Sequence, residues 1–310
     1  MTTITLGTTG AALRAAVQAL PICRHCEGCQ GADPTNPDPV HHASIELTGK
    51  CNHECMFCYS RVAGDAGTLP EPGYYGEPDP QAITVSQYGE PLMEPERLLA
   101  VLREAREAYG NVRLDLQTNG TLLTPALWER LEGLVDLCMV SVSAADPTHH
   151  AAVSGADTFD QLVQALSLVG RSRVWGIVRV VDMPGINSDQ LPAITELARR
   201  TGMDEVMVHQ CAVHADNRDR LVAAGLDLDA VAYVPGLVMR VARAAEETGM
   251  RATIQGCVLS TLRTMDADTL PYLVKDSLSE VPRLKRQRAQ MGKSACGKDC
   301  PGCPMRAGNP

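Results

Sequence analysis

The sequence is poor in aromatic side chains and in positive charge. Phe, Trp and Tyr together make up 4% of its 310 residues, with only two Phe and two Trp. Lys and Arg number 28 against 37 Asp and Glu, a net charge of −9 that argues against bulk binding to nucleic acid. No apolar run approaches the roughly 20 residues that a membrane-spanning helix needs, so we expect no membrane association.

An export signal is also missing from the start of the chain. Residues 10–21 (GAALRAAVQALP) are interrupted by Arg14 and Gln18, which predicts a short amphipathic helix rather than a signal peptide. We therefore expect a cytoplasmic protein. Its twelve cysteines then indicate metal or redox use, because disulfide scaffolds are normally short and secreted.

Nine of the twelve cysteines fall into three tight triplets, which is a pattern typical of metal ligands. The triplets are Cys23, Cys26 and Cys29; Cys51, Cys55 and Cys58; and Cys296, Cys300 and Cys303. The other three cysteines stand alone in the sequence. Of these, we expect Cys138 and Cys257 to be packed thiols.

Two kinds of metal site fit such triplets. Thiolate-only sets suit iron–sulfur clusters. Zinc usually takes four ligands in paired C-x2-C units, and the nearby His25 or His53 would complete such a set. Both metals remain open from spacing alone.

Strands and helices alternate through most of the chain. Strands are predicted near 41–47, 82–88, 112–118, 137–143, 173–181 and 205–210, with a last one near 251–256. Helices are predicted near 95–109, from Thr124-Pro125, and near 158–170, 188–201 and 228–248, whereas 21–40 and 60–80 are predicted to be loops. This order predicts an α/β fold with a parallel sheet, for which we favour a partial (β/α)6-type barrel.

The chain is predicted to have three parts. An N-terminal helix and Cys-rich segment covers 1–40, the partial barrel covers 41–256, and an irregular C-terminal extension with the last triplet covers 257–310. Barrel enzymes carry their chemistry at the C-terminal ends of the strands, and the unusual polar residues of this sequence gather at those ends.

The middle triplet, C-x3-C-x2-C with Phe57 before the last cysteine, resembles the radical S-adenosylmethionine (SAM) superfamily. Supporting motifs follow at consecutive strand ends: Gly89-Glu90-Pro91, then Gln117-Thr118-Asn119-Gly120, then the pair Ser141 and Ser143. The resemblance covers roughly 41–212. It implies that Cys51, Cys55 and Cys58 hold a [4Fe–4S] cluster with one open iron, which binds the amino and carboxylate groups of SAM.

The resemblance also implies a reaction and a set of contacts. A reduced cluster cleaves SAM to a 5′-deoxyadenosyl radical, which abstracts hydrogen from the substrate. Gly89, Glu90 and Pro91 would receive the methionine end of SAM. Phe57, Asn119, Ser141 and Ser143 would line the cofactor site, and a ferredoxin or flavodoxin-type protein would donate the electron.

Some features resemble the nitrogenase cofactor maturase NifB in particular. These are His41-His42, the Pro184-Gly185-Ile186-Asn187 segment and the terminal run from Cys300 to Gly308. A cluster-building protein is therefore an alternative function, and a zinc- or cluster-bearing electron-transfer protein is a third. The substrate stays open as a small molecule, a peptide or a cluster.

The outer triplets are predicted to hold one or two auxiliary iron–sulfur clusters. Cys23-x2-Cys26-x2-Cys29 resembles half of a bacterial ferredoxin motif with Asp33 at the position of the fourth cysteine, and Cys303 could supply the missing ligand. We expect both chain ends to fold over the barrel and to place an auxiliary cluster near the active site.

A last group follows the sixth predicted strand. His209, Cys211 and His214 would face the substrate cavity, where they could ligate a cluster, donate hydrogen or bind substrate. Arg179, inside the fifth predicted strand, would bind an anionic group or form a buried ion pair.

Overall fold

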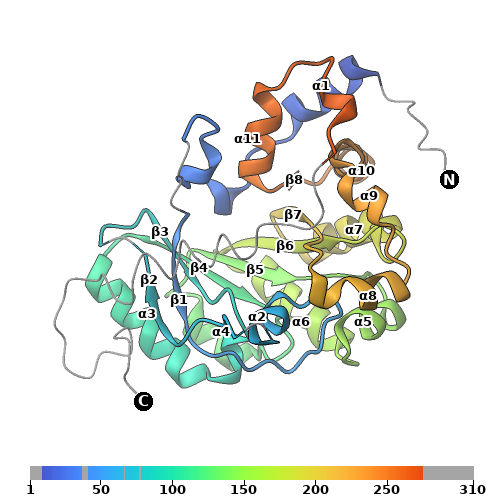
Figure 1. Cartoon of the computed structure of the whole chain (residues 1–310). Coiled ribbons are helices and arrows are strands. Elements are labelled where there is room, and N and C mark those ends of the chain that lie inside the picture. Colours follow the sequence, from blue (N-terminus) through green and yellow to red (C-terminus); the bar gives the residue numbers. More distant parts are fainter. Residues whose placement is uncertain (1–8, 37–40, 66, 77, 275–310) are drawn as a thin grey trace.

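The computed structural model describes residues 9–36, 41–65, 67–76 and 78–274. Its centre is an open eight-stranded sheet in the order β2-β1-β3-β4-β5-β6-β7-β8 (Figure 1). β2 pairs antiparallel with β1, and the other neighbouring pairs are parallel. The predicted partial barrel is confirmed. The strands are β1 (Ala43–Glu46), β2 (Gly73–Tyr75), β3 (Ala82–Val85), β4 (Arg113–Thr118), β5 (Leu137–Ser141), β6 (Trp175–Asp182), β7 (Glu205–Gln210) and β8 (Ala252–Ile254).

Helices cover one face of the sheet (Figure 1). They are α3 (Pro95–Tyr109), α4 (Pro125–Leu131), α6 (Phe159–Gly170), α7 (Leu191–Thr201) and α10 (Val234–Thr248). Alternate strand residues such as Leu114, Leu116, Val178 and Val180 are buried in the core shared with these helices. Because side chains alternate across a strand, the residues between them lie on the inner face of the barrel.

The inner face is more polar than the outer one, although Leu137, Met139, Ile177 and Met207 form an apolar cluster on it. It carries Asp115 and Gln117 from β4, Arg179 from β6 and His209 from β7. Arg179 pairs with Met207, two residues before His209, so Arg179 and His209 lie on the same face. Buried polar groups cost free energy unless they are paired, so this face is built for a bound molecule or for internal ion pairs.

Six features differ from the sequence prediction. The loop predicted over 60–80 contains α2 (Tyr59–Asp65) and the edge strand β2. α5 (Pro147–Ser154) and α8 (Ala215–Ala223) were not predicted, since both are short and α5 has almost no amphipathic pattern. The long helix predicted over 228–248 breaks at Tyr233, before Pro235, into α9 (Leu228–Ala232) and α10. The start of the C-terminal extension is helical, as α11 (Gly256–Thr264).

The N-terminal segment crosses the barrel at the end where the parallel strands begin. After α1 (Gly10–Ala19) it forms two short 3-10 helices, η1 (Arg24–Cys26) and η2 (Gln30–Ala32). The Arg24 N–H donates to Glu205 Oε2 at 3.0 Å, at the start of β7. His25 Nδ1 lies 2.7 Å from Asp115 Oδ2 of β4. We call residues 20–36 the N-terminal plug, because they close this end of the barrel.

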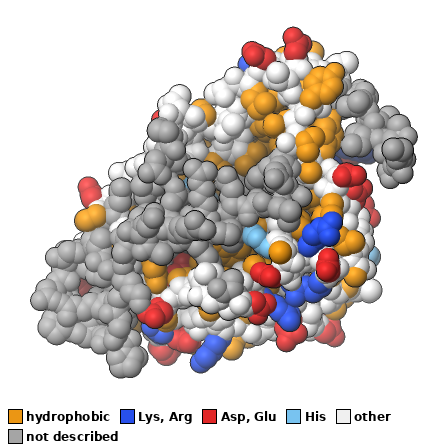
Figure 2. All heavy atoms as spheres, viewed as in Figure 1, with side chains coloured by type: hydrophobic (Ala, Val, Ile, Leu, Met, Phe, Trp, Pro, Cys, Tyr) orange, Lys and Arg blue, Asp and Glu red, His pale blue; other side chains and the backbone are white. Residues whose placement is uncertain are grey.

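Surface properties agree with the composition. On the face shown in Figure 2, Lys and Arg side chains lie among Asp and Glu rather than in one positive patch. None of the helices in the described part of the chain is long and apolar enough to cross a membrane.

Candidate functional site

The middle cysteine triplet lies in the loop between β1 and α2, at the C-terminal edge of the sheet. Two backbone hydrogen bonds fasten this loop to the end of α5: Glu54 N–H to Ser154 O at 2.9 Å, and Met56 N–H to Val153 O at 3.0 Å. Arg220 of α8 also donates from Nε to Met56 O at 3.0 Å. The two helices that sequence reasoning missed therefore hold the cysteine loop in place.

The three thiols of this loop are close enough to affect one another electrostatically. Burial, followed by the nearby Cys58 and Cys51 thiolates, raises the pKa of Cys55 to about 12. Cys51 is exposed, while Cys55 and Cys58 are half-buried, and none forms a disulfide. Three free thiols on one short loop with one open side are a donor set that fits a cluster with a fourth, accessible iron. Cys51, Cys55 and Cys58 would hold it.

The Gly89-Glu90-Pro91 turn packs directly against the cysteine loop. The Glu90 N–H donates to Lys50 O at 2.8 Å, one residue before Cys51. Gly89 has φ +65°, and a Cβ there would lie 2.2 Å from Thr48 O and 2.7 Å from Lys50 O. Only glycine fits so close an approach, so the motif joins the β3 end to the β1 end.

The Glu90 carboxylate is engaged by hydrogen bonds inside the protein. It is buried and accepts three hydrogen bonds: from Asn119 N at 2.6 Å, from Thr118 Oγ1 at 2.7 Å and from Leu92 N at 3.0 Å. Burial nevertheless raises the pKa of Glu90 to about 7. The side chain thus links the ends of β3 and β4, and the contact with SAM predicted for this turn would fall to its backbone.

Asn119 lies beside the first cysteine. Its Nδ2 donates to Asn52 Oδ1 at 2.8 Å and lies 3.9 Å from Cys51 Sγ. The His53 N–H also points at Cys51 Sγ, at 3.4 Å. N–H groups aimed at a ligating sulfur tune the potential of a cluster, so this arrangement suits a redox site.

The two serines at the end of β5 are separated by their environments. Ser141 is exposed at the C-terminal edge. The carbonyl of Ser143 accepts from Asn187 Nδ2 at 2.9 Å, and Asn187 also donates to Val181 O at 3.0 Å. Asn187 therefore ties the β5 and β6 ends together through backbone carbonyls, while the side chains of the exposed Ser141 and the half-buried Ser143 stay candidates for a cofactor contact.

Arg179 and His209 lie side by side on the inner face. Arg179 donates to Gln117 Oε1 at 2.8 Å, while its buried Nε has no partner among the described residues. The buried ion pair predicted as one role for Arg179 is therefore not present among the described residues. Burial, the Arg179 charge and His25 hold the pKa of His209 well below its usual value, so its imidazole is neutral at neutral pH.

Phe57, Cys211 and Val213 share a small apolar cluster that α8 and α9 complete. Burial, followed by Asp182, raises the pKa of Cys211 to about 12. A thiol in such surroundings stays protonated, which suits hydrogen donation. His214 precedes α8, and its N–H donates to Asn217 Oδ1 at 2.7 Å, so its backbone helps to begin that helix.

The first triplet lies at the opposite end of the barrel, in the N-terminal plug. Cys23 is buried, with its Sγ 3.1 Å from Met207 Sδ inside the barrel. A strand rises about 3.3 Å per residue, so β7 separates the two ends by roughly 17 Å. The expectation that this triplet lies near the active site is therefore wrong. Cys296, Cys300 and Cys303 lie outside the described residues.

The histidines proposed as zinc ligands are engaged elsewhere. His25 faces Asp115, and His53 Nε2 lies 3.0 Å from Thr158 Oγ1. Within the described ranges, no three His, Cys, Asp or Glu side chains are arranged to hold a single metal ion.

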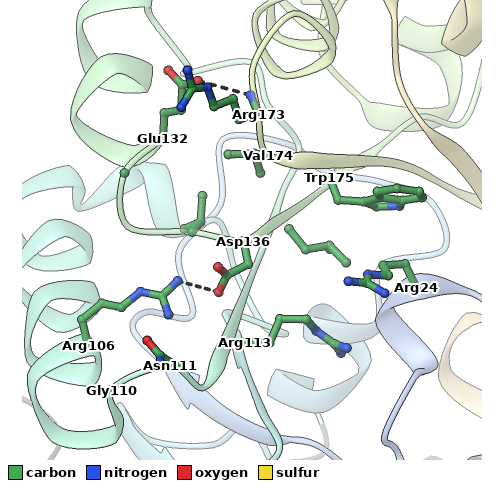
Figure 3. Close-up of a pocket in the computed structure, with 13 residues that line it drawn as sticks. Arg24, Arg106, Gly110, Asn111, Arg113, Glu132, Asp136, Arg173, Val174 and Trp175 are labelled. Carbon is green, nitrogen blue, oxygen red and sulfur yellow. Dashed lines mark hydrogen bonds and ion pairs between the residues drawn. The ribbon is translucent and has the colours of Figure 1, made fainter.

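A solvent-open groove of about 700 Å³ also lies at the strand-start end, between β5, β6 and α3 (Figure 3). Figure 3 shows Arg106 turned toward Asp136, with Arg113, Arg24 and Trp175 along the opposite side. None of the residues predicted to bind SAM lines this groove, so its size alone does not make it the active site.

The Radical SAM superfamily model matches residues 45–198, which include the cysteine loop and the ends of β3 to β6. The chain is also 34% identical over 271 residues to the uncharacterized protein MJ0804 of Methanocaldococcus jannaschii, covering 86% of this chain and 92% of that one. The chain belongs to the radical SAM superfamily and is an enzyme of that class. The family implies a [4Fe–4S] cluster and SAM.

More distant relatives have assigned names. The probable GTP 3′,8-cyclase of Thermoplasma volcanium is 23% identical, over 52% of this chain and 51% of its own length. The FeMo cofactor biosynthesis protein NifB of Azotobacter vinelandii is 19% identical, over 54% of this chain and 40% of its own. A solved structure of anSMEcpe with bound AdoMet covers 68% of this chain and 62% of its own, with a TM-score of 0.48 and 16% identity.

Proposed function

We propose that this enzyme binds SAM at the Cys51–Cys58 loop and uses it to abstract hydrogen from a substrate held in the barrel. The observation that carries the proposal is the contact between the Gly89-Glu90 turn and Lys50 O, because it joins the two motifs at one edge. The bound cluster and SAM supply a one-electron cleavage of a sulfonium carbon–sulfur bond, which yields a 5′-deoxyadenosyl radical.

The protein's own residues would position these groups. Cys51, Cys55 and Cys58 would ligate three irons, with Asn119 and the His53 N–H orienting Cys51. The backbone of Gly89 and Glu90 would meet the methionine end of SAM. Ser141 would meet another part of the cofactor, since it is exposed at the same edge.

The inner face would bind the substrate. The Arg179 guanidinium offers an unused N–H to an anionic group of SAM or of the substrate, in the polar interior beside the neutral imidazole of His209. Cys211, protonated at neutral pH and next to Phe57 at the strand ends, would be a hydrogen donor. These roles for Arg179, His209 and Cys211 are part of the proposal.

The position of the first triplet supports its use as a tool rather than as the material of the reaction. An auxiliary cluster in the N-terminal plug would lie about one strand length from the SAM site, too far for direct attack by the radical. That placement favours an electron-relay or structural cluster over a NifB-like precursor at this triplet.

The test is SAM cleavage by the anaerobically reconstituted and chemically reduced full chain. We expect 5′-deoxyadenosine and methionine in a 1:1 ratio, with at least tenfold more product than from a Cys55→Ala variant. Cys138→Ala is the matched control, because Cys138 is buried on the outer face, away from both triplets. Equal product from wild type and the Cys55→Ala variant would refute the proposal.

A further inference from the structure

Cys257 is a single cysteine in the sequence but not in the fold. It is the second residue of α11, directly after β8 and Gln255. α11 packs against η2, which begins at the residue after Cys29. The single cysteine and the first triplet are therefore brought close by elements that are far apart in the sequence. Figure 1 shows α11 beside the N-terminal segment.

The contacts at the start of α11 are close. The Gly256 N–H donates to Cys26 Sγ at 3.3 Å. A Cβ on Gly256 would lie 2.5 Å from Cys26 Cβ and 3.0 Å from Cys26 Sγ, so only glycine allows this approach. Cys257 directly follows Gly256, so its backbone lies next to a residue that contacts the triplet.

The thiols also affect one another electrostatically. After burial, the charges of Cys26 and Cys29 raise the pKa of Cys257 to about 11. Cys26 has a lowered pKa, unlike the other thiols around it. A hydrogen bond from the Cys23 thiol, followed by His25 and the Gly256 N–H, lowers the pKa of Cys26 to about 6, against the effect of burial. The N-terminal end of a helix favours a thiolate at this place.

Packing in the core does not account for Cys257. It was expected to be a packed thiol, yet it is only half-buried. The packed cysteine Cys138, by contrast, is wholly buried in the main core. Cys257 instead follows Gly256, whose N–H contacts Cys26 Sγ, so it starts beside the first triplet, where a fourth thiolate would be needed.

We propose that Cys257 is the fourth thiolate ligand of an iron–sulfur cluster held by Cys23, Cys26 and Cys29. This inference rests on the auxiliary cluster of the proposed function but not on SAM cleavage. A cluster with four thiolate ligands has no open iron, so it serves electron relay or stability rather than substrate binding. It also removes the need for Cys303 to supply a ligand there.

The test isolates this cluster. A full-length variant with Cys51, Cys55 and Cys58 changed to Ala cannot hold the SAM cluster, so its remaining iron belongs to the auxiliary sites. In that background we expect Cys257→Ala to lose about four irons per chain, or to show the electron paramagnetic resonance signal of a [3Fe–4S] cluster. Cys26→Ala should lose the same iron, whereas Cys138→Ala should keep it.

Cys257→Ser keeps the side-chain size and the helix start, so a change in its cluster reports on the sulfur and not on folding. We expect its spectrum to differ from that of the parent while its circular dichroism does not. Iron content and spectra of both Cys257 variants equal to those of the parent would overturn the inference. So would one zinc ion in place of the iron, or no iron lost on Cys26→Ala. Failure of SAM cleavage would leave this result unaffected, because the test background lacks the SAM cluster.

Discussion

The Glu90 carboxylate accepts the Asn119 N–H at 2.6 Å and so locks the ends of two neighbouring strands together. Through the Glu90 N–H, the same residue also holds the loop that carries Cys51. One residue, through its side chain and its backbone, therefore links three segments: the ends of β3 and β4 and the cysteine loop. Its buried position makes that function sensitive to both shape and protonation.

Glu90→Gln should destabilise the protein by about 1–3 kcal/mol, because the amide NH2 would face a donor that the carboxylate now accepts. Product formation should fall at least tenfold. Urea unfolding of the apoprotein and the 5′-deoxyadenosine assay measure the two effects. Glu96→Gln, at an exposed position, should change stability by no more than about 0.5 kcal/mol.

Glu90 also predicts a pH dependence. Its pKa is raised from 4.5 to about 7, so the folded state keeps a proton that the unfolded state has lost. Stability contributed by this group is full below about pH 4.5 and falls by up to about 1.4 kcal/mol per pH unit until about pH 7. Between pH 5 and 7, the free energy of unfolding of wild type should fall relative to Glu90→Gln. A constant difference would contradict the raised pKa.

Gly89→Ala should disrupt the SAM site. The new methyl group would clash with Thr48 O and Lys50 O, in a backbone conformation that disfavours side chains. We expect less iron at the Cys51–Cys58 loop and at least a tenfold loss of SAM cleavage. Gly64→Ala in α2 meets no atom within 4 Å, so it should leave activity unchanged and raise stability by up to about 1 kcal/mol.

Asn119→Ala should make the SAM cluster harder to reduce. Its Nδ2 lies near Cys51 Sγ, and donors near a ligating sulfur stabilise the added electron. Loss of about 0.5–1.5 kcal/mol corresponds to a midpoint potential roughly 20–60 mV more negative. Redox titration of the reconstituted protein measures this, with Asn111→Ala in the distant groove as the control.

Arg179→Met separates function from stability. Because Arg179 has no acidic partner among the described residues, removing its charge should leave the free energy of unfolding equal or higher while activity falls at least tenfold. Arg113→Met is the contrasting variant: Arg113 pairs with the buried Asp115 at 2.8 Å, so its loss should cost about 3–5 kcal/mol. A large loss of stability in Arg179→Met would point to a structural role.

The fold could be predicted from the sequence because strands alternate with helices along it and because turn residues mark the strand ends. The helix predicted at 95–109 matches α3 residue for residue. The motif at Gly89-Glu90-Pro91 was found at the correct strand end. The hydrogen bonds of the Glu90 side chain were not predicted, because two of its three donors lie at the end of β4. Sequence distance also hid Cys257, although the Gln255-Gly256-Cys257 step from strand to helix is a place where backbone N–H groups commonly face an anion.

The N-terminal plug has a consequence for how the protein acquires its metal. Cys26 and Gly256 touch across 230 positions, and the plug also bonds to β4 and β7. Such contacts form late in folding, because long-range pairing must wait for the chain between to be in place. The auxiliary cluster would therefore be inserted into a nearly finished barrel. Once inserted, the cluster would join the N-terminal plug to α11. Loss of the metal would then release both segments from each other.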